Sequence, residues 1–156
     1  MAVRYAMLIA LTAAVTVTSA AAAWPVGTKQ RVAITLTTVH ESSFVLIPLQ
    51  GGEITRDNGT GVEQPSTSCH DVIRDGQKVG LCKSRWTLMG KQGTLLIRSS
   101  AEWVNPGSGG CGIAVGTWSV MRGTGSYAGV TGGGRSAYDA HCTRWYARHE
   151  GLLTLP

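Results

Sequence analysis

Apolar and polar positions alternate with a period of two over several stretches of this chain. Val32, Ile34 and Leu36 are apolar, and the residues between them are small or polar. Such alternation is typical of a β-strand with one buried face. Residues 43–50 predict a second, more continuously apolar strand, and residues 93–104 a longer one with an apolar and a polar face. No stretch beyond the N-terminal region keeps a helical period, so the pattern predicts an all-β fold.

Glycine-rich segments are expected to connect these strands. By composition, residues 57–61 (DNGTG) predict a loop, and residues 122–134 predict a long connection. Neither a linker nor an internal repeat divides the chain, so we expect one domain. The remaining strands are expected at residues 86–89, 111–120, 135–148 and 151–156.

One hairpin can be placed residue by residue. Asp75-Gly76 is a strong two-residue turn signal. If Arg74 and Gln77 form the closing pair, counting outward places Cys69 directly opposite Cys82 at a non-hydrogen-bonded position. The Cα atoms of such a pair lie about 4.5 Å apart, which a disulfide can span. Turn chemistry and cysteine spacing therefore both predict the bridge Cys69–Cys82.

The other two cysteines, Cys111 and Cys142, then pair by elimination. We expect them on strands that flank the glycine-rich connection and are neighbours in an antiparallel sheet. The alternative is a metal site built from Cys69, His70 and Cys82. The CxxC spacing of zinc sites is absent, so we favour two disulfides and no bound metal.

The first 23 residues are typical of a secretory signal peptide. Arg4 is followed by an apolar run over residues 6–17 and by small residues up to Ala23. The run is short for a membrane span, which needs roughly 20 apolar residues. We therefore expect a signal peptide at residues 1–23, one domain at residues 24–156, and a secreted or periplasmic protein with no membrane anchor. Disulfides persist in such oxidising compartments.

Charge and motifs exclude several function classes. The net charge is +5, but the basic residues are scattered and form no run. This distribution argues against nucleic-acid binding. Gly123-Thr124-Gly125 continues neither as GxGxxG nor to a GK(S/T) ending, and the chain lacks GxSxG and HExxH, so nucleotide-binding, serine-hydrolase and zinc-protease chemistry are not indicated. We expect no cofactor.

Residues 116–134 (GTWSVMRGTGSYAGVTGGG) carry the most distinctive motif. This segment resembles the GTGxY/F-x-G-x-x-G-x-G signature of dirigent proteins and of exported bacterial members of the allene oxide cyclase-like barrel superfamily. The resemblance implies a closed antiparallel β-barrel of about eight strands. It also implies that Tyr127 plugs back into the barrel and that a strand begins near Arg135.

The same resemblance implies a function. Barrels of this size hold either packed side chains or one small ligand. A family member would bind a small apolar molecule and guide its cyclisation or isomerisation by holding it in a productive shape, without a cofactor. Two alternatives stay open: a non-catalytic, lipocalin-like binding module, and an extracellular protein-interaction or inhibitor barrel with a filled lumen.

Aromatic residues on the predicted strands are candidates to line a ligand pocket, although aromatic residues more often fill a core. Tyr127 has in addition a purely structural explanation as the plug of the glycine-rich turn. The pocket candidates are Phe44, Trp103, Trp118, Tyr127 and Tyr138.

Two pairs of polar residues are candidates for catalysis. Arg98 and Glu102 share one face of a strand and could bind and polarise a ligand. Asp139 and His141 share a face of the final strand, where a histidine beside a carboxylate could do acid–base work. Both pairs lie opposite the apolar face of their strand, so simple solvent exposure is the competing interpretation.

Overall fold

The computed structural model describes residues 27–38, 42–65, 67–104, 112–141 and 144–156, with the backbone alone at His141. These residues form an all-β domain with one single-turn 3₁₀ helix, η1 (Gly125–Tyr127). The strands are β1 (Lys29–Thr38), β2 (Ser42–Pro48), β3 (Asp57–Glu63), β4 (Ser68–Arg74), β5 (Gln77–Gly90), β6 (Thr94–Val104), β7 (Gly112–Gly123), β8 (Thr131–His141) and β9 (Arg144–Thr154).

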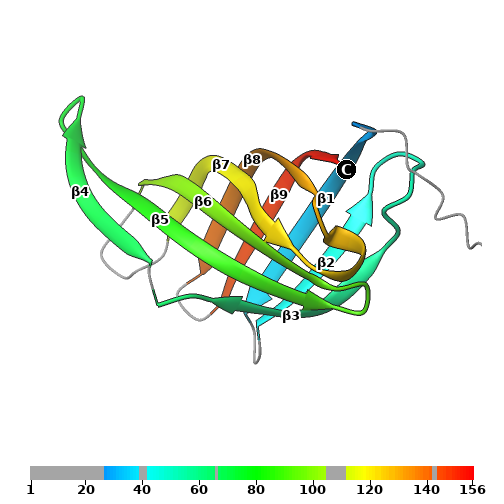
Figure 1. Cartoon of the computed structure of the whole chain (residues 1–156). Helices are drawn as coiled ribbons and strands as arrows, with labels where there is room; N and C mark the ends of the chain where they lie inside the picture. Colours follow the sequence, from blue (N-terminus) through cyan, green and yellow to red (C-terminus); the bar gives the residue numbers. More distant parts are fainter. Residues whose placement is uncertain (1–26, 39–41, 66, 105–111, 142–143) are drawn as a thin grey trace, which may run out of the picture.

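Eight of these strands close into an antiparallel barrel. The sheet runs in the order β3-β2-β1-β9-β8-β7-β6-β5, and pairing of β3 with β5 closes it. The ninth strand, β4, pairs only with the first half of β5, and the two project beyond the barrel as an arm (Figure 1). The structure confirms the prediction of a closed antiparallel barrel of about eight strands.

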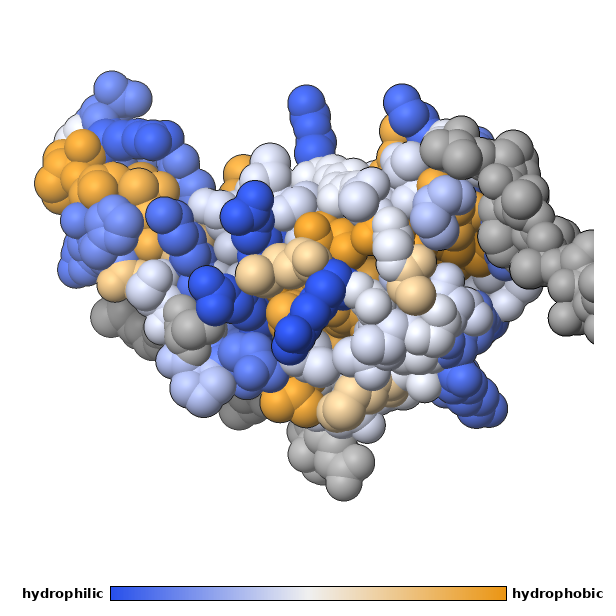
Figure 2. Space-filling view, viewed as in Figure 1, coloured by the Kyte–Doolittle hydropathy of each residue, from blue (hydrophilic) through white to orange (hydrophobic). Residues whose placement is uncertain are grey.

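The arm is the hairpin predicted from the sequence. Its turn residues Asp75 and Gly76 have φ angles of 49° and 77°, the left-handed region that this type of hairpin turn requires. Cys69 and Cys82 are register partners, and their sulfurs form a disulfide across a Cα–Cα distance of 4.1 Å. Figure 2 shows hydrophobic side chains gathered over this arm.

The second predicted bridge would join β7 to β8. Cys111 and Cys142 lie outside the described residues. The nearest described pair is Gly112 with Ala140, which are register partners on β7 and β8. The bridge Cys111–Cys142 therefore remains a prediction.

The lumen is filled over most of its length by the inward-facing residues of alternating strands. Aliphatic side chains dominate, as the period-two pattern predicts. The largest inward residues of this core include Val32, Ile34, Leu36, Phe44, Leu46, Leu88, Leu95, Ile97 and Leu153.

One end of the barrel is closed by a buried polar contact. The 3₁₀ turn directs Tyr127 inward, where its hydroxyl donates to Asp57 Oδ2 at 2.9 Å. Asp57 also accepts from the backbone N–H groups of Asn58 and Lys91 at 2.8 and 2.9 Å. The carboxylate thus joins β3, the β5–β6 turn and the β7–β8 turn.

Two expectations about glycine-rich segments and one about a long strand were wrong. Residues 57–61 lie in β3 and are not a loop. The connection expected at residues 122–134 is shorter, because β7 continues to Gly123 and β8 begins at Thr131. The single strand expected at residues 135–148 is two strands, β8 and β9, and β9 includes most of the expected closing strand.

Close approach of neighbouring strands explains the two errors at the glycine-rich segments. Gly134 pairs with Gly151, and a Cβ added at Gly134 would overlap the carbonyl oxygen of Glu150. A Cβ at Gly59 would overlap the carbonyl oxygen of Met89. At these positions glycine allows close contact within the sheet. The sequence interpretation had instead treated these glycines as signals for a turn or loop.

Candidate functional site

The end of the barrel opposite Tyr127 contains a cavity of about 300 Å³. Four aromatic residues from four strands line it: Trp86 on β5, Trp103 on β6, Tyr138 on β8 and Trp145 on β9. The Cys69–Cys82 bridge and Glu63 on β3 also line it. The cavity is therefore mostly apolar, with a carboxylate in its lining.

The aromatic rings contact one another around the cavity. Trp86 and Trp145 meet edge to face with their centroids 4.9 Å apart. Tyr138 lies between Trp103 and Trp145, at centroid distances of 5.7 and 6.4 Å. Such ring pairs stabilise one another beyond simple burial. They hold the wall in one arrangement and so preform the cavity.

Polar groups lie on the inner face beside this wall. The Ser84 and Ser99 hydroxyls share a hydrogen bond of 2.7 Å, and Trp86 Nε1 donates to Ser84 Oγ at 3.2 Å. Deeper in the lumen, Ser136 Oγ lies 2.7 Å from His149 Nδ1. These contacts fix the orientation of the Trp86 indole and the His149 imidazole.

Two buried polar atoms in the described part of the chain lack a hydrogen-bond partner. They are the Tyr138 hydroxyl and His149 Nε2, and the two rings meet edge to face with centroids 5.6 Å apart. A buried polar atom without a partner costs free energy, so each such atom invites an explanation. The Tyr138 ring lines the cavity, but its hydroxyl is shielded from solvent and lies near Ser99 and Ser136.

Burial determines the protonation of both groups. Burial raises the pKa of Tyr138, and the negative charge of Glu63 adds to the effect, whereas the Ser99 and Ser136 hydroxyls oppose it. Burial lowers the pKa of His149 to about 4. Near neutral pH Tyr138 is therefore a neutral hydrogen-bond donor, and His149 is an uncharged imidazole.

Glu63 supplies negative charge at this end of the barrel. It pairs with Trp86 across the β3–β5 ladder that closes the barrel. Its Oε1 accepts a hydrogen bond of 2.7 Å from Thr67 Oγ1, and its side chain is exposed. Glu63 therefore brings a carboxylate to an otherwise mostly apolar lining.

The five aromatic candidates from the sequence are distributed along the barrel. Trp103 and Tyr138 line the cavity. Phe44 and Trp118 are buried in the filled part of the lumen, where Trp118 Nε1 donates to the Glu150 carbonyl at 3.2 Å. Tyr127 closes the opposite end.

The polar candidates are not assembled at the cavity. Arg98 and Glu102 lie on the outer face of β6, where Arg98 Nε donates to Ser119 at 2.9 Å and Glu102 pairs with Arg74 at 2.5 Å. Asp139 lies on the face of β8 opposite Tyr138. The side chain of His141 lies outside the described residues.

Sequence reasoning missed five residues that matter here. Alternation within β5 would have placed Ser84 and Trp86 on the same face as Cys82, and alternation within β9 would have placed Trp145 and His149 on one face. Glu63 was missed because its segment adjoins the residues taken for a loop.

Comparison with known proteins adds no assignment. No family model, curated protein or solved structure matches the chain. Among the described residues, no cluster of three or more histidine, cysteine, aspartate or glutamate side chains could hold a metal ion. The described residues also include no helix of the length and apolarity needed to cross a membrane.

Proposed function

We propose that this protein binds one small, mostly apolar molecule in the aromatic cavity at the open end of its barrel. The observation that carries the proposal is the cavity of about 300 Å³, lined by three tryptophans and Tyr138. Small-molecule sites are typically apolar clefts of about 300–1,000 Å³ with a few well-placed polar groups. Here the polar side chains of the lining include Glu63, Thr67 and Ser84.

The arrangement favours a flat ligand with one polar substituent. Aromatic side chains provide planar contact surfaces, and the Glu63 carboxylate in the lining can accept a hydrogen bond from a hydroxyl or amine of the ligand. Such a contact would add selectivity for ligands that carry a donor.

Catalysis is the second candidate function, and the carboxylate of Glu63 in a mostly apolar lining favours it. Glu63 could stabilise positive charge on a substrate or accept a proton from it. Such a group suits cyclisation or isomerisation without a cofactor, as the resemblance to the allene oxide cyclase-like superfamily suggests. Glu63→Gln should then abolish turnover while leaving binding measurable.

A blocking variant tests the binding proposal. Ala140 lines the cavity, whereas Ala137 lies on the outer face of the same strand. We expect Ala140→Trp to fill the cavity and Ala137→Trp to leave it open. Binding of 1-naphthol, followed by tryptophan fluorescence, should be lost in the first variant and unchanged in the second. Equal binding by both variants would overturn the proposal.

The natural ligand is best sought by native mass spectrometry of the protein purified from its own host. A co-purified small molecule that Ala140→Trp excludes would identify it. If neither such a molecule nor naphthol binding is found, the protein-interaction alternative gains support, because a protein partner would use the outside of the barrel.

We also propose that residues 1–23 direct export and are removed. The Cys69–Cys82 disulfide is consistent with an oxidising compartment. Intact-mass measurement of the protein from its host should give a mature chain that begins at or near Trp24. A full-length chain in the cytosol would contradict the proposal.

A further inference from the structure

A second concave site lies on the outside of the barrel, where the arm leaves it. The side chains of three basic residues, Lys83, Arg85 and Arg98, contribute to a groove of about 510 Å³. They alternate along β5 and β6 with inward-facing residues, so they point away from the lumen. Figure 2 shows strongly hydrophilic side chains on the face where β5, β6 and β7 lie.

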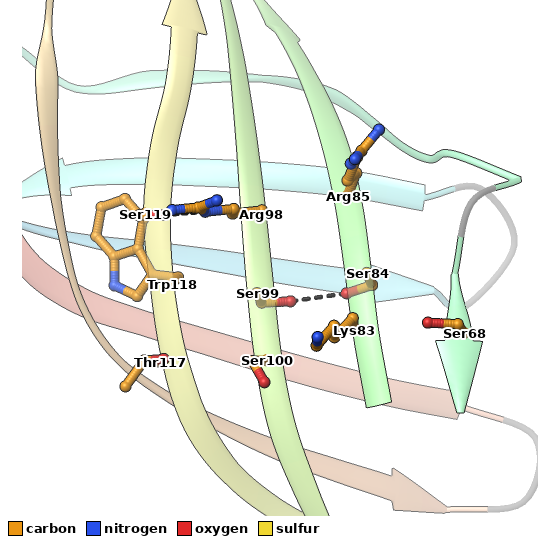
Figure 3. A pocket seen from close by; sticks show the side chains of 10 residues that line it. All are labelled: Ser68, Lys83, Ser84, Arg85, Arg98, Ser99, Ser100, Thr117, Trp118 and Ser119. Atoms are coloured by element: carbon orange, nitrogen blue, oxygen red, sulfur yellow. Dashed lines mark hydrogen bonds between the residues drawn. The ribbon is translucent and has the colours of Figure 1, made fainter. Parts of the chain in front are cut away.

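Sheet register places these cations beside hydroxyl groups in two adjacent rows. Arg85 on β5 is the direct partner of Arg98 on β6, which in turn pairs with Ser119 on β7. In the next row outward-facing Lys83 pairs with Ser100, and Ser100 with Thr117. The groove therefore presents basic groups and hydroxyls from the outer faces of β4 to β7, and its lining also includes Trp118 and no acidic residue (Figure 3).

The Arg85–Arg98 pair is electrostatically unfavourable by itself, because like charges directly opposite each other destabilise a sheet. Among the described residues, neither these arginines nor Lys83 forms an ion pair with a carboxylate. Nearby acidic residues have other partners: Glu102 pairs with Arg74, and Glu150 pairs with Arg148. The groove thus concentrates positive charge without internal compensation.

One of the two arginines is already oriented. Arg98 Nε donates to Ser119 Oγ at 2.9 Å, and Figure 3 shows the Arg98 side chain extended toward β7 beside that serine. This hydrogen bond leaves the terminal guanidinium nitrogens of Arg98 free to bind an anion. A guanidinium binds phosphate and sulfate through two parallel hydrogen bonds.

We propose that this groove binds the phosphate or sulfate group of a ligand. Arg98 would bind the group bidentately, Arg85 and Lys83 would contribute charge, and the Ser100 and Thr117 hydroxyls would donate further hydrogen bonds. A bound oxyanion would also relieve the repulsion between the opposed arginines. The site lies outside the barrel and does not depend on the function proposed for the lumen.

Titration calorimetry at low ionic strength with inorganic phosphate, inorganic sulfate and phenyl phosphate tests this proposal. Inorganic ions bound as tightly as the ester would indicate a site for a free ion, and tighter binding of the ester would indicate an organic ligand. The matched variants are Arg98→Gln and Arg144→Gln, which remove the same charge from two exposed positions, only one of which lines the groove.

We expect Arg98→Gln to weaken binding at least tenfold, Arg98→Lys to weaken it by a smaller factor, and Arg144→Gln to change it less than twofold. Naphthol binding in the lumen should be unchanged in all three variants, which separates this site from the cavity. No measurable binding of any probe to the parent, or equal weakening by Arg98→Gln and Arg144→Gln, would overturn the proposal.

Discussion

The Tyr127 hydroxyl donates a hydrogen bond of 2.9 Å to Asp57 Oδ2, joining two residues that lie 70 positions apart in the chain. Both side chains are almost completely buried. Burial and the Asp57 carboxylate both raise the pKa of Tyr127 above its ordinary value. The phenol therefore remains protonated near neutral pH and can donate this hydrogen bond.

Removing this hydroxyl should destabilise the barrel. In Tyr127→Phe, Asp57 loses one hydrogen-bond donor while its backbone donors remain. We expect the free energy of unfolding to fall by about 1–3 kcal/mol, the usual cost of a buried polar group deprived of its partner. Urea denaturation measures the loss. Tyr146→Phe, at an exposed tyrosine on β9, is the control and should change stability little.

The buried His149 predicts a pH-dependent stability. Its pKa is about 4 in the folded protein and close to 6.5 when unfolded, so the unfolded chain binds more protons between these values. Stability should therefore fall as pH falls from 6.5 towards 4, by up to about 3 kcal/mol. Urea denaturation at several pH values measures the slope.

A variant separates the contribution of His149 to the pH dependence of stability from the contribution of acidic side chains that titrate in the same range. His149→Gln removes the titrating group, so the difference between its stability and that of the parent should shrink as pH falls through the window. His70→Gln, at an exposed position, should run parallel to the parent. A constant offset between His149→Gln and the parent across the window would contradict the assignment.

The glycine pair of β8 and β9 provides a test of close strand approach. Gly134→Ala should destabilise the barrel by about 1–3 kcal/mol, because its new methyl group would overlap the Glu150 carbonyl oxygen. Nothing lies within 4 Å of a Cβ added at Gly51, so Gly51→Ala should be nearly neutral. Thermal unfolding of the two variants compares them directly, and equal effects would refute the steric argument.

Peptide mapping under non-reducing conditions tests the cysteine assignment. We expect Cys69 linked to Cys82, as their register requires, and Cys111 linked to Cys142. A link from Cys69 to either of the other two would be incompatible with the arm. Free thiols at Cys111 and Cys142 would refute only the second bridge.

The sequence predicts the hairpin best, because turn chemistry and cysteine spacing are local and independent signals. Asp75-Gly76 determines the turn and thereby the partner of Cys69. Strand boundaries at glycine-rich segments were predicted poorly. Gly59 and Gly134 allow strands to approach closely, and no local signal distinguishes this role of glycine from a turn.

The candidate site could be predicted only in part for a related reason. Tyr138 and Trp103 stand out as aromatic residues on strands, but their meeting with Trp86 and Trp145 depends on how four strands order themselves around the barrel. The opposed Arg85 and Arg98 likewise come from different strands. Their juxtaposition follows from register, which requires the strand pairing to be known.

Closure through β3 and β5 has a consequence for self-association. In a closed barrel each strand has two neighbours, but among the described strands β4 has only β5. Its other edge carries unpaired backbone donors and acceptors, which can template an additional strand. Asp71 and Arg74 place charge on β4, as natural edge strands commonly do. Growth of this sheet from one molecule to the next would have to begin at β4.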